Sequence, residues 1–200
     1  MPTLIVATGN ANKRREIQHM LGSTFHVLSL ADIPDAPDIV EDGNTFEANA
    51  IKKARIIANH TGRPTLADDS GLEVDALNGA PGVYSARFAG KNATDTDNNA
   101  KLLALIKNIP DHQLTARFHC AMALVLPNGQ TKTAHGIWEG GIVRQARGSN
   151  GFGYDPLFFV PEHNCTCAEL SDEIKNSLSH RGRALRAIYP HILAALSSDA

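Results

Sequence analysis

Residues 66–73 read Leu-Ala-Asp-Asp-Ser-Gly-Leu-Glu, and two adjacent carboxylates stand at their centre. The stretch begins with an apolar pair that is typical of the end of a buried strand. After the acidic pair, Leu72 and Val74 alternate with acidic residues, as in a second extended segment. We therefore expect Asp68 and Asp69 to lie at a turn between two strands, where a sheet edge presents their charge.

The acidic pair is compatible with chemistry and with a simple turn. Adjacent carboxylates repel each other, and a hard cation such as Mg²⁺, shared with a substrate phosphate, would hold both at one sheet edge. Alternatively, Ser70 and Gly71 form an ordinary turn in which the aspartates cap backbone amides. This stretch alone leaves both interpretations open.

The composition predicts one globular domain over residues 1–200, with enough length for a sizeable core and for two lobes. The chain has 200 residues, of which 42% are hydrophobic and 20% are charged. Its formal net charge of -2 provides no overall basic field, so we expect no nucleic-acid partner.

Cysteine usage and hydropathy predict a cytoplasmic protein. Three cysteines, an odd number, argue against a disulfide framework. Cys165 and Cys167 lack zinc-ligand spacing and a second ligand pair, so we interpret them as structural. The first residues do not resemble a signal peptide, and no apolar stretch is long enough to span a bilayer, so we expect no membrane partner.

The N-terminal residues predict a strand, a loop and a helix. Residues 3–8 form an apolar β-type run, residues 9–12 interrupt it, and a helical pattern follows until Gly22. Backbone amides at the helix start, together with Lys13, suit a polyphosphate. An ordinary connection with Asn12 as the helix cap is equally compatible with this segment.

A second helix is expected after residue 45. Asn44 or Thr45 caps it, and Glu47 is placed to complete a capping box from Asn44. Asn49 and Lys53 are four positions apart, so they lie beside each other on this helix.

Glu41 ends an irregular acidic loop over residues 32–42. It is either a solvated loop acid, which is the usual place of such residues, or a further oxygen ligand for a cation at Asp68 and Asp69. The sequence alone favours the solvated position.

The middle third of the chain predicts an antiparallel meander. Residues 115–126 form the longest strand candidate, and Asn128-Gly129 is a hairpin turn into residues 131–138. We expect Gly140-Gly141 to separate that strand from residues 142–147.

Residues 148–156 form a glycine-rich loop that contains Phe152. An exposed aromatic side chain in such a loop can stack on a base, whereas a plain turn would bury it in the core.

Farther on, Ser171 caps a short helix that carries Lys175, and residues 179–183 place cations just before or at the start of the last helix. Helix dipoles disfavour cations there, so we expect an anionic ligand or acidic surface nearby, with a solvated basic turn as the alternative.

Taken as a set, these residues resemble the inosine/xanthosine triphosphate pyrophosphatases, in the family's order over residues 8–183. The motifs that carry the resemblance are Thr8-Gly9-Asn10 with Lys13, Thr45-Phe46, Asn49-Ala50 with Lys53-Ala54, residues 66–72, residues 79–87, residues 151–156 and Ser179-His180-Arg181-Gly182.

The resemblance implies an α/β fold, elongated and two-lobed, around a long mixed β-sheet with a substrate cleft between the lobes. It also implies a homodimer. The implied activity is Mg²⁺-dependent hydrolysis of ITP, dITP and XTP between the α and β phosphates, giving the monophosphate and pyrophosphate. Such an enzyme keeps deaminated purines out of DNA and RNA.

The resemblance also implies roles for individual residues. Asp69 would be the general base and a metal ligand, Glu41 a second metal ligand and Asp68 a supporting carboxylate. The implied substrate-binding residues are Thr8, Gly9, Asn10, Ala11, Asn12, Lys13, Ser70, Phe152, Gly153, Tyr154, Asp155, Lys175, His180 and Arg181.

Base selectivity follows from the acceptor oxygen that hypoxanthine and xanthine carry at C6, where adenine carries an amino donor. Adenine would leave a donor such as Lys175 or Arg181 unpaired, at a cost of about 1–3 kcal/mol per buried group.

The chain departs from the family at Ala48, where a glutamate is common, which weakens any role for an acid there. A pyrophosphatase for modified pyrimidine nucleotides and a nucleotide-sensing or RNA-binding module are the alternative functions.

Overall fold

The chain folds around a mixed β-sheet, which confirms the expected α/β class. The computed structural model describes residues 2–197. Within them the sheet has seven strands in the order β2-β1-β3-β4-β5-β6-β7. Both neighbours of β1 run parallel to it, whereas β6 is antiparallel to its neighbours. The strands are β1 (Thr3–Val6), β2 (His26–Leu28), β3 (Thr65–Val74), β4 (Thr115–Val125), β5 (Thr131–Ile142), β6 (Phe158–Val160) and β7 (Cys165–Thr166).

The helices begin at capping residues that their sequences supply. They are α1 (Ala11–Leu21), α2 (Phe46–Thr61), α3 (Asp95–Ile106), α4 (Asp172–Leu178) and α5 (His180–Ser197). Ser171 caps α4 as expected, and Thr94 caps α3, since each hydroxyl accepts a hydrogen bond from a backbone N–H of the first turn. The cationic residues that were expected at or before the last helix lie in the first turn of α5.

The chain divides into two compact units. The first contains the residues up to Asp69, residues 120–136 and the residues from Arg181 on, and the second contains residues 70–119 and 137–180. β3, β4 and β5 therefore contribute residues to both units. The single pyrophosphatase domain over residues 1–200 and the cleft between two lobes stay predictions.

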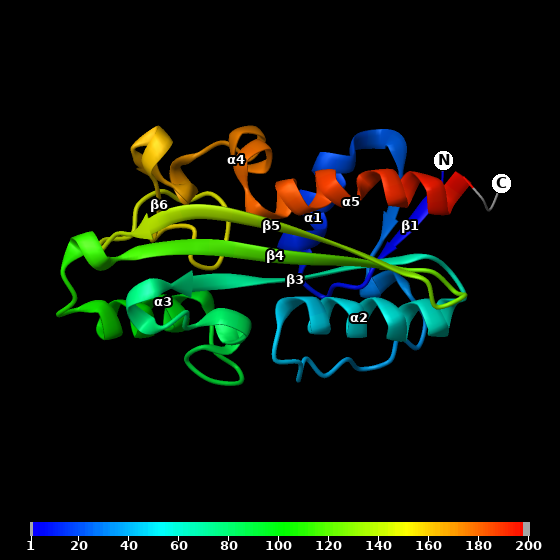
Figure 1. Cartoon of the computed structure of the whole chain (residues 1–200), viewed down its shortest axis with the longest axis horizontal. Helices are drawn as coiled ribbons and strands as arrows, with labels where there is room; N and C mark the ends of the chain where they lie inside the picture. The colour runs from blue at the N-terminus through cyan, green and yellow to red at the C-terminus, as the bar shows by residue number, and fades with distance from the viewer. Residues whose placement is uncertain (1, 198–200) are drawn as a thin grey trace. The chain divides into compact units, whose positions relative to one another are not determined.

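The first unit has three layers. Along β1, Leu4 and Val6 join an apolar cluster with α1 and α5, whereas Ile5 and Ala7 join a cluster with α2. This alternation follows from the strand geometry, in which successive side chains point to opposite faces. Figure 1 shows α2 on one side of the strands and α5 on the other.

The second unit has its own core around Trp138. The Trp138 ring packs on Phe158 with ring centroids 5.3 Å apart, and Leu102 and Ile106 of α3 belong to the same cluster. Trp138 is only 2% exposed and is a residue of this core.

The expected turn at the acidic pair is wrong. β3 runs from Thr65 to Val74 without interruption, so Asp68 and Asp69 lie in the middle of a strand. Most residues of β3 are buried on both faces, so the strand continues through the interior instead of ending where charge appears. Two cationic side chains compensate Asp68, and one cationic and one amide side chain compensate Asp69.

The expected strand break at Gly140-Gly141 is also wrong. Gly140-Gly141 does not end the strand, because β5 continues to Ile142. A Cβ at position 140 would lie 2.4 Å from the carbonyl oxygen of Phe159 and 2.6 Å from the Phe158 ring, so glycine there permits the close approach of β6.

One of the two expected caps of α2 is confirmed, whereas the expected capping box from Asn44 is wrong. Thr45 is the cap, and its hydroxyl accepts from the Ala48 N–H at 3.1 Å. Glu47 cannot complete a box from Asn44 in this register, and its carboxylate lies 2.6 Å from His135 Nε2 instead.

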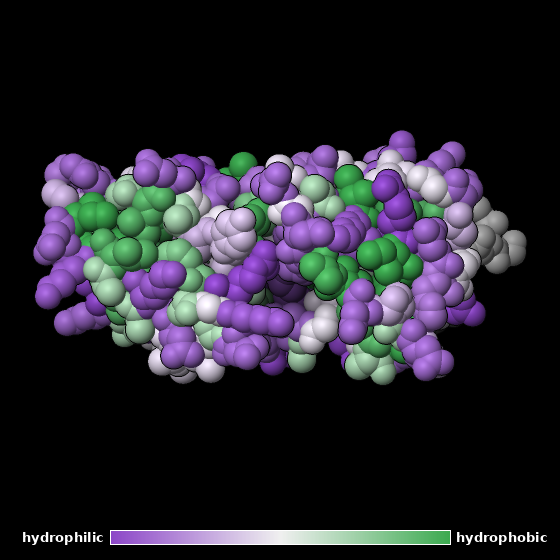
Figure 2. All heavy atoms as spheres, turned by 90° about the horizontal axis from the view of Figure 1, so that it is seen from below, coloured by the Kyte–Doolittle hydropathy of each residue, from purple (hydrophilic) through white to green (hydrophobic). Residues whose placement is uncertain are grey.

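No helix in residues 2–197 is both long enough and apolar enough to cross a membrane. Figure 2 shows the face that bears α2, where hydrophobic side chains reach the surface in patches bordered by hydrophilic ones. Val40 and Tyr84 are the most exposed large hydrophobic residues, at 65% and 57%.

The Gly140→Ala substitution is expected to lower the free energy of unfolding by about 1–3 kcal/mol, because the new methyl group forces β5 and β6 apart. Urea denaturation followed by circular dichroism measures the change. Lys132→Ala, at an exposed position of the same strand, is the control and is expected to stay within about 0.5 kcal/mol. An unchanged Gly140→Ala protein would contradict the close approach.

Candidate functional site

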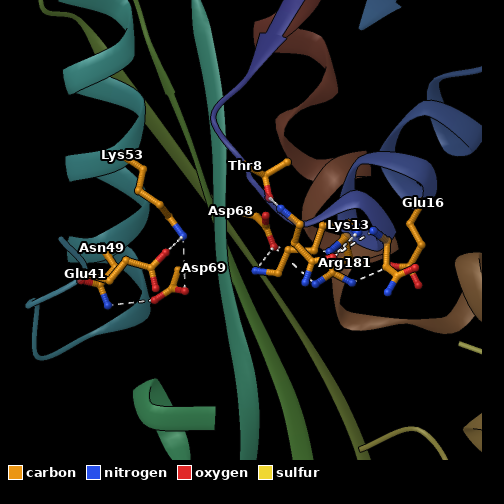
Figure 3. Close-up of polar contacts among 11 residues, drawn as sticks. Thr8, Lys13, Glu16, Glu41, Asn49, Lys53, Asp68, Asp69 and Arg181 are labelled. Carbon is orange, nitrogen blue, oxygen red and sulfur yellow. Dashed lines mark hydrogen bonds and ion pairs between the residues drawn. The ribbon is translucent and has the colours of Figure 1, made fainter. Parts of the chain in front are cut away.

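The acidic pair of β3 presents one carboxylate to each face of the strand. Successive strand side chains point in opposite directions. In Figure 3, Asp69 lies toward α2 with Asn49 and Lys53, and Asp68 lies toward Lys13 and Arg181. The hydrogen-bonding partners of the two carboxylates therefore differ, and a cation shared by both stays a prediction.

Asp69 is held by two side chains of α2. Asn49 Nδ2 donates to Asp69 Oδ2 at 2.9 Å, and Lys53 Nζ lies 3.5 Å from Asp69 Oδ1. The spacing of four residues places Asn49 and Lys53 side by side on the helix, as expected. Lys53 Nζ also donates to Glu41 Oε1 at 2.7 Å, so one ammonium links the two carboxylates.

Burial changes the protonation behaviour of this group. Desolvation raises the pKa of Asp69, and the nearby Lys53 and Lys13 only partly offset that effect. Desolvation alone would lower the pKa of Lys53, but Asp69, Asp68 and Glu41 outweigh it and raise the pKa. Lys53 therefore stays a cation, while Asp69 takes up a proton more readily than an exposed aspartate does.

The donor set around Lys53 fits a Mg²⁺ ion that is bound together with substrate. Glu41 and Asp69 are both within reach of one cationic group. Mg²⁺ typically takes one or two carboxylates and completes its shell with water and phosphate oxygens. Among residues 2–197 no group of three or more His, Cys, Asp or Glu side chains could hold a metal ion. Two carboxylates would leave the remaining coordination positions of such an ion to other oxygen ligands.

Asp68 belongs to a buried ionic network on the opposite face. Lys13 Nζ lies 3.0 Å from Asp68 Oδ2, and Arg181 Nε and Nη2 each lie 3.3 Å from the same oxygen. Arg181 Nη1 donates to Glu16 Oε2 at 2.5 Å. Two cations thus face two carboxylates, and Arg181 is only 2% exposed.

The network keeps Asp68 ionised. Burial would raise the pKa of Asp68, but Lys13, Arg181 and Lys53 together hold it well below its usual range. Glu16 and Asp68 in turn raise the pKa of Arg181, although burial opposes this. Sequence analysis missed Glu16, and its spacing of three residues from Lys13 on one helix is the signal that could have found it.

The expected phosphate-binding segment surrounds the start of α1. Asn10, rather than Asn12, caps the helix, and its side chain accepts from the N–H groups of Asn12 and Lys13 at 2.9 and 3.2 Å. The Asn10 N–H in turn donates to Thr8 Oγ1 at 3.1 Å. Gly9, Asn10 and Ala11 are exposed, so an anion could approach this positive end of the helix.

The aromatic loop of the second unit is organised by Asp155. Asp155 Oδ2 accepts from the Phe152 N–H at 2.8 Å and from Lys175 Nζ at 2.7 Å. Lys175 Nζ also lies 4.9 Å from the centre of the Phe152 ring. Phe152 is half-buried, so part of its ring is open to solvent.

Tyr154 and Gly153 of this loop are tied to neighbouring elements. Tyr154 is buried in the core, and its hydroxyl donates to the Ser85 carbonyl at 2.8 Å. The Gly153 N–H donates to Asp95 Oδ2 at 2.7 Å, and Asn99 Nδ2 donates to the Gly153 carbonyl at 3.0 Å. Asp95 and Asn99 of α3 were not expected at the loop, since nothing in their local sequence marks them.

The remaining expected residues lie in the second unit. The His180 imidazole stacks on Phe118 with ring centroids 4.7 Å apart, and Ser70 is half-buried. The expected site residues therefore form two sets. Residues 8–13, Glu41, Asp68, Asp69 and Arg181 belong to the first unit, and Ser70, residues 152–155, Lys175 and His180 belong to the second.

Comparisons with known proteins identify similar sequences and structures. The model of the Ham1 family matches residues 4–191. A dITP/XTP pyrophosphatase of Geobacter sulfurreducens is 55% identical over 193 residues, which cover 96% of this chain and 97% of that protein. A dITP/XTP pyrophosphatase of Vibrio cholerae is 50% identical and covers 96% of this chain and 97% of that protein. The solved structure of a HAM1 protein from Coxiella burnetii superposes with a TM-score of 0.87 at 45% identity, covering 98% of this chain and 100% of that one.

The Arg181→Met substitution is expected to lower the free energy of unfolding by about 3–5 kcal/mol, because it leaves Asp68 and Glu16 buried without their shared cation. Thermal or urea denaturation measures the loss. Arg183→Met, at an exposed position on the same helix, is expected to change stability by no more than about 0.5 kcal/mol. Equal stability of the two variants would argue against the network.

Proposed function

The chain belongs to the Ham1 family, and on this premise we propose that it hydrolyses ITP, dITP and XTP to the nucleoside monophosphate and pyrophosphate. The observation that carries the proposal is the Asp69 carboxylate, buried in mid-strand and linked through Lys53 to Glu41. Relatives about half identical over nearly their whole length are named dITP/XTP pyrophosphatase, which supports the same substrate class.

We propose that Asp69 is the general base. It accepts a proton from water, whose oxygen attacks the α phosphorus while the bond from that phosphorus to the bridging oxygen breaks and pyrophosphate leaves. A raised pKa suits this role, because a base whose pKa lies nearer neutrality accepts the proton more completely. Asn49 Nδ2 donates to Asp69 Oδ2, which fixes the orientation of the carboxylate that takes the proton from the attacking water.

Glu41 and Asp69 would hold a Mg²⁺ ion, which when bound neutralises charge on the polyphosphate and on the pyrophosphate leaving group. Lys53 contributes a fixed positive charge at the same place. The exposed residues at the start of α1, with Lys13, are proposed to bind the triphosphate.

Phe152 and Lys175 are proposed to recognise the base. Phe152 offers a half-buried ring for stacking, and the Lys175 ammonium above that ring is a donor for the C6 oxygen of hypoxanthine or xanthine. Both cations are buried, but Arg181 is engaged by Asp68 and Glu16. Lys175 pairs with Asp155 and lies over the Phe152 ring, so we assign the main donor role toward the base to Lys175. His180, Ser70, Gly153 and Tyr154 stay predicted substrate residues.

The biological setting is part of the proposal. Hydrolysis of deaminated purine triphosphates in the cytoplasm would remove them before polymerases insert them into DNA or RNA. Cys120, Cys165 and Cys167 form no disulfide within the described residues, and a reducing compartment is part of the proposal. The homodimer expected from the resemblance is likewise proposed, and sedimentation equilibrium would test it.

Pyrophosphate release from ITP, dITP and XTP is expected to be far faster than release from ATP, GTP or dUTP, and to require Mg²⁺. Asp69→Asn is expected to lower kcat by at least about 100-fold, because general-base catalysis typically contributes a factor of this order. Asp38→Asn, at an exposed position, is the control. Fast hydrolysis of dUTP would favour a pyrimidine enzyme, and binding without hydrolysis would favour a nucleotide sensor.

Phe152→Leu is expected to reduce kcat/KM for ITP by about 10-fold or more, because base stacking contributes about 1–3 kcal/mol per base. Phe88→Leu is a matched control, since Phe88 is also half-buried beneath a lysine, with Lys101 Nζ 4.5 Å from its ring centre. Steady-state kinetics on both variants would test the assignment. An equal loss in the two proteins would show that Phe152 acts through packing alone.

A further inference from the structure

The Asn49 carboxamide connects α2 to two other parts of the candidate site, the loop that carries Glu41 and the strand that carries Asp69. Its Oδ1 accepts from the Gly43 N–H at 2.8 Å, and its Nδ2 donates to Asp69 Oδ2 at 2.9 Å. Gly43 is two residues after Glu41, in the loop that precedes α2. One side chain of α2 thus touches both the loop that carries Glu41 and the strand that carries Asp69.

The chemistry of its neighbours fixes the orientation of this carboxamide. A backbone N–H can only donate, so the atom that faces the Gly43 N–H must be the carbonyl oxygen, while Nδ2 also lies 3.5 Å from the Gly43 carbonyl. The NH₂ group then faces Asp69, whose ionised carboxylate can only accept. A flipped amide would place donor against donor and acceptor against acceptor, so both bonds form together or both are lost.

The surroundings of Asn49 show that this position is tightly constrained. Asn49 is 0% exposed, so neither bond is easily replaced by water. A Cβ at position 43 would lie 2.6 Å from Asn49 Oδ1 and 3.2 Å from the Ala48 Cβ, so a side chain there would displace the carboxamide. Glycine at position 43 therefore leaves room for the Asn49 carboxamide. The lack of space for a side chain, rather than an unusual backbone angle, favours glycine there.

We propose that Asn49 is a positioning residue for the reaction, which sets the Glu41 loop and the Asp69 carboxylate at a fixed separation. Because a carboxamide is neutral, it orients Asp69 without adding a charge that competes with Lys53. The proposal rests on the proposed function, since it assigns Asn49 a part in the same site. Asn49 acts through Asp69 and the loop, and does not itself take part in the chemistry.

The Asn49→Asp variant separates the two bonds. It keeps an acceptor toward the Gly43 N–H but replaces Nδ2, which donates to Asp69 and at 3.5 Å to the Gly43 carbonyl, with a second acceptor. Its kcat for ITP is expected to fall by about 100-fold with KM changed by no more than about threefold, because misplacing a reacting group by about 1 Å costs on the order of 100-fold in rate. Asn59→Asp introduces the same change at an exposed position of α2 and is expected to leave both constants near wild type.

Gly43→Ala tests the bridge from its other end. It is expected to lower kcat as Asn49→Ala does, and the double variant is expected to be no worse than either single one, because both changes break the same bridge. Additive losses in kcat would overturn the proposal. So would an Asn49→Ala enzyme whose kcat stays within about threefold of wild type.

Hydrogen exchange at the Gly43 amide, followed by NMR in Mg²⁺-free protein, provides a readout that needs no activity. The amide is expected to stay protected in Asn49→Asp and to exchange much faster in Asn49→Ala. Unchanged protection in Asn49→Ala would overturn the bridge. If wild-type protein cleaves none of the triphosphates, the proposed function fails, while this exchange experiment still supports or overturns the bridge on its own.

Discussion

Two adjacent carboxylates in the middle of a buried strand are the constraint on which this structure depends. Burying an unpaired carboxylate costs several kcal/mol, so β3 can pass through the interior only if each face supplies compensation. Lys13 and Arg181 provide it for Asp68, and Asn49 and Lys53 provide it for Asp69. The positions of α1, α2 and α5 around β3 are thus electrostatic requirements as well as packing solutions.

The two faces give identical side chains opposite properties. Asp68 meets a lysine and a bifurcated guanidinium contact, and these cations hold its pKa low despite burial. Asp69 meets a neutral amide and a more distant ammonium, so burial prevails and its pKa rises. Neighbouring titratable groups whose pKa values are pushed apart are typical of acid–base sites. Asp68 therefore serves as a permanent anion that anchors cations, and Asp69 is suited to accept a proton.

Much of the local structure was predictable because it depends on short-range rules. The neighbouring positions of Asn49 and Lys53 follow from helical periodicity, and this expectation is confirmed. The Ser171 cap and the hairpin after β4 follow from local hydrogen-bonding chemistry. One local rule gave a wrong prediction, because Ser70-Gly71 is typical of a turn but lies within one long strand.

The sequence by itself determined the α/β class, most helices and strands, and the residue types that could form a phosphate and cation site. Only the tertiary structure decided that Asp68 and Asp69 face different partners, that Glu16 completes the Arg181 network, and that Asn49 bridges to Gly43. Helix periods and caps are set within a few residues, whereas these contacts join residues six to 165 positions apart along the chain. Such pairings depend on how strands and helices pack, so helix periods and caps alone do not specify them.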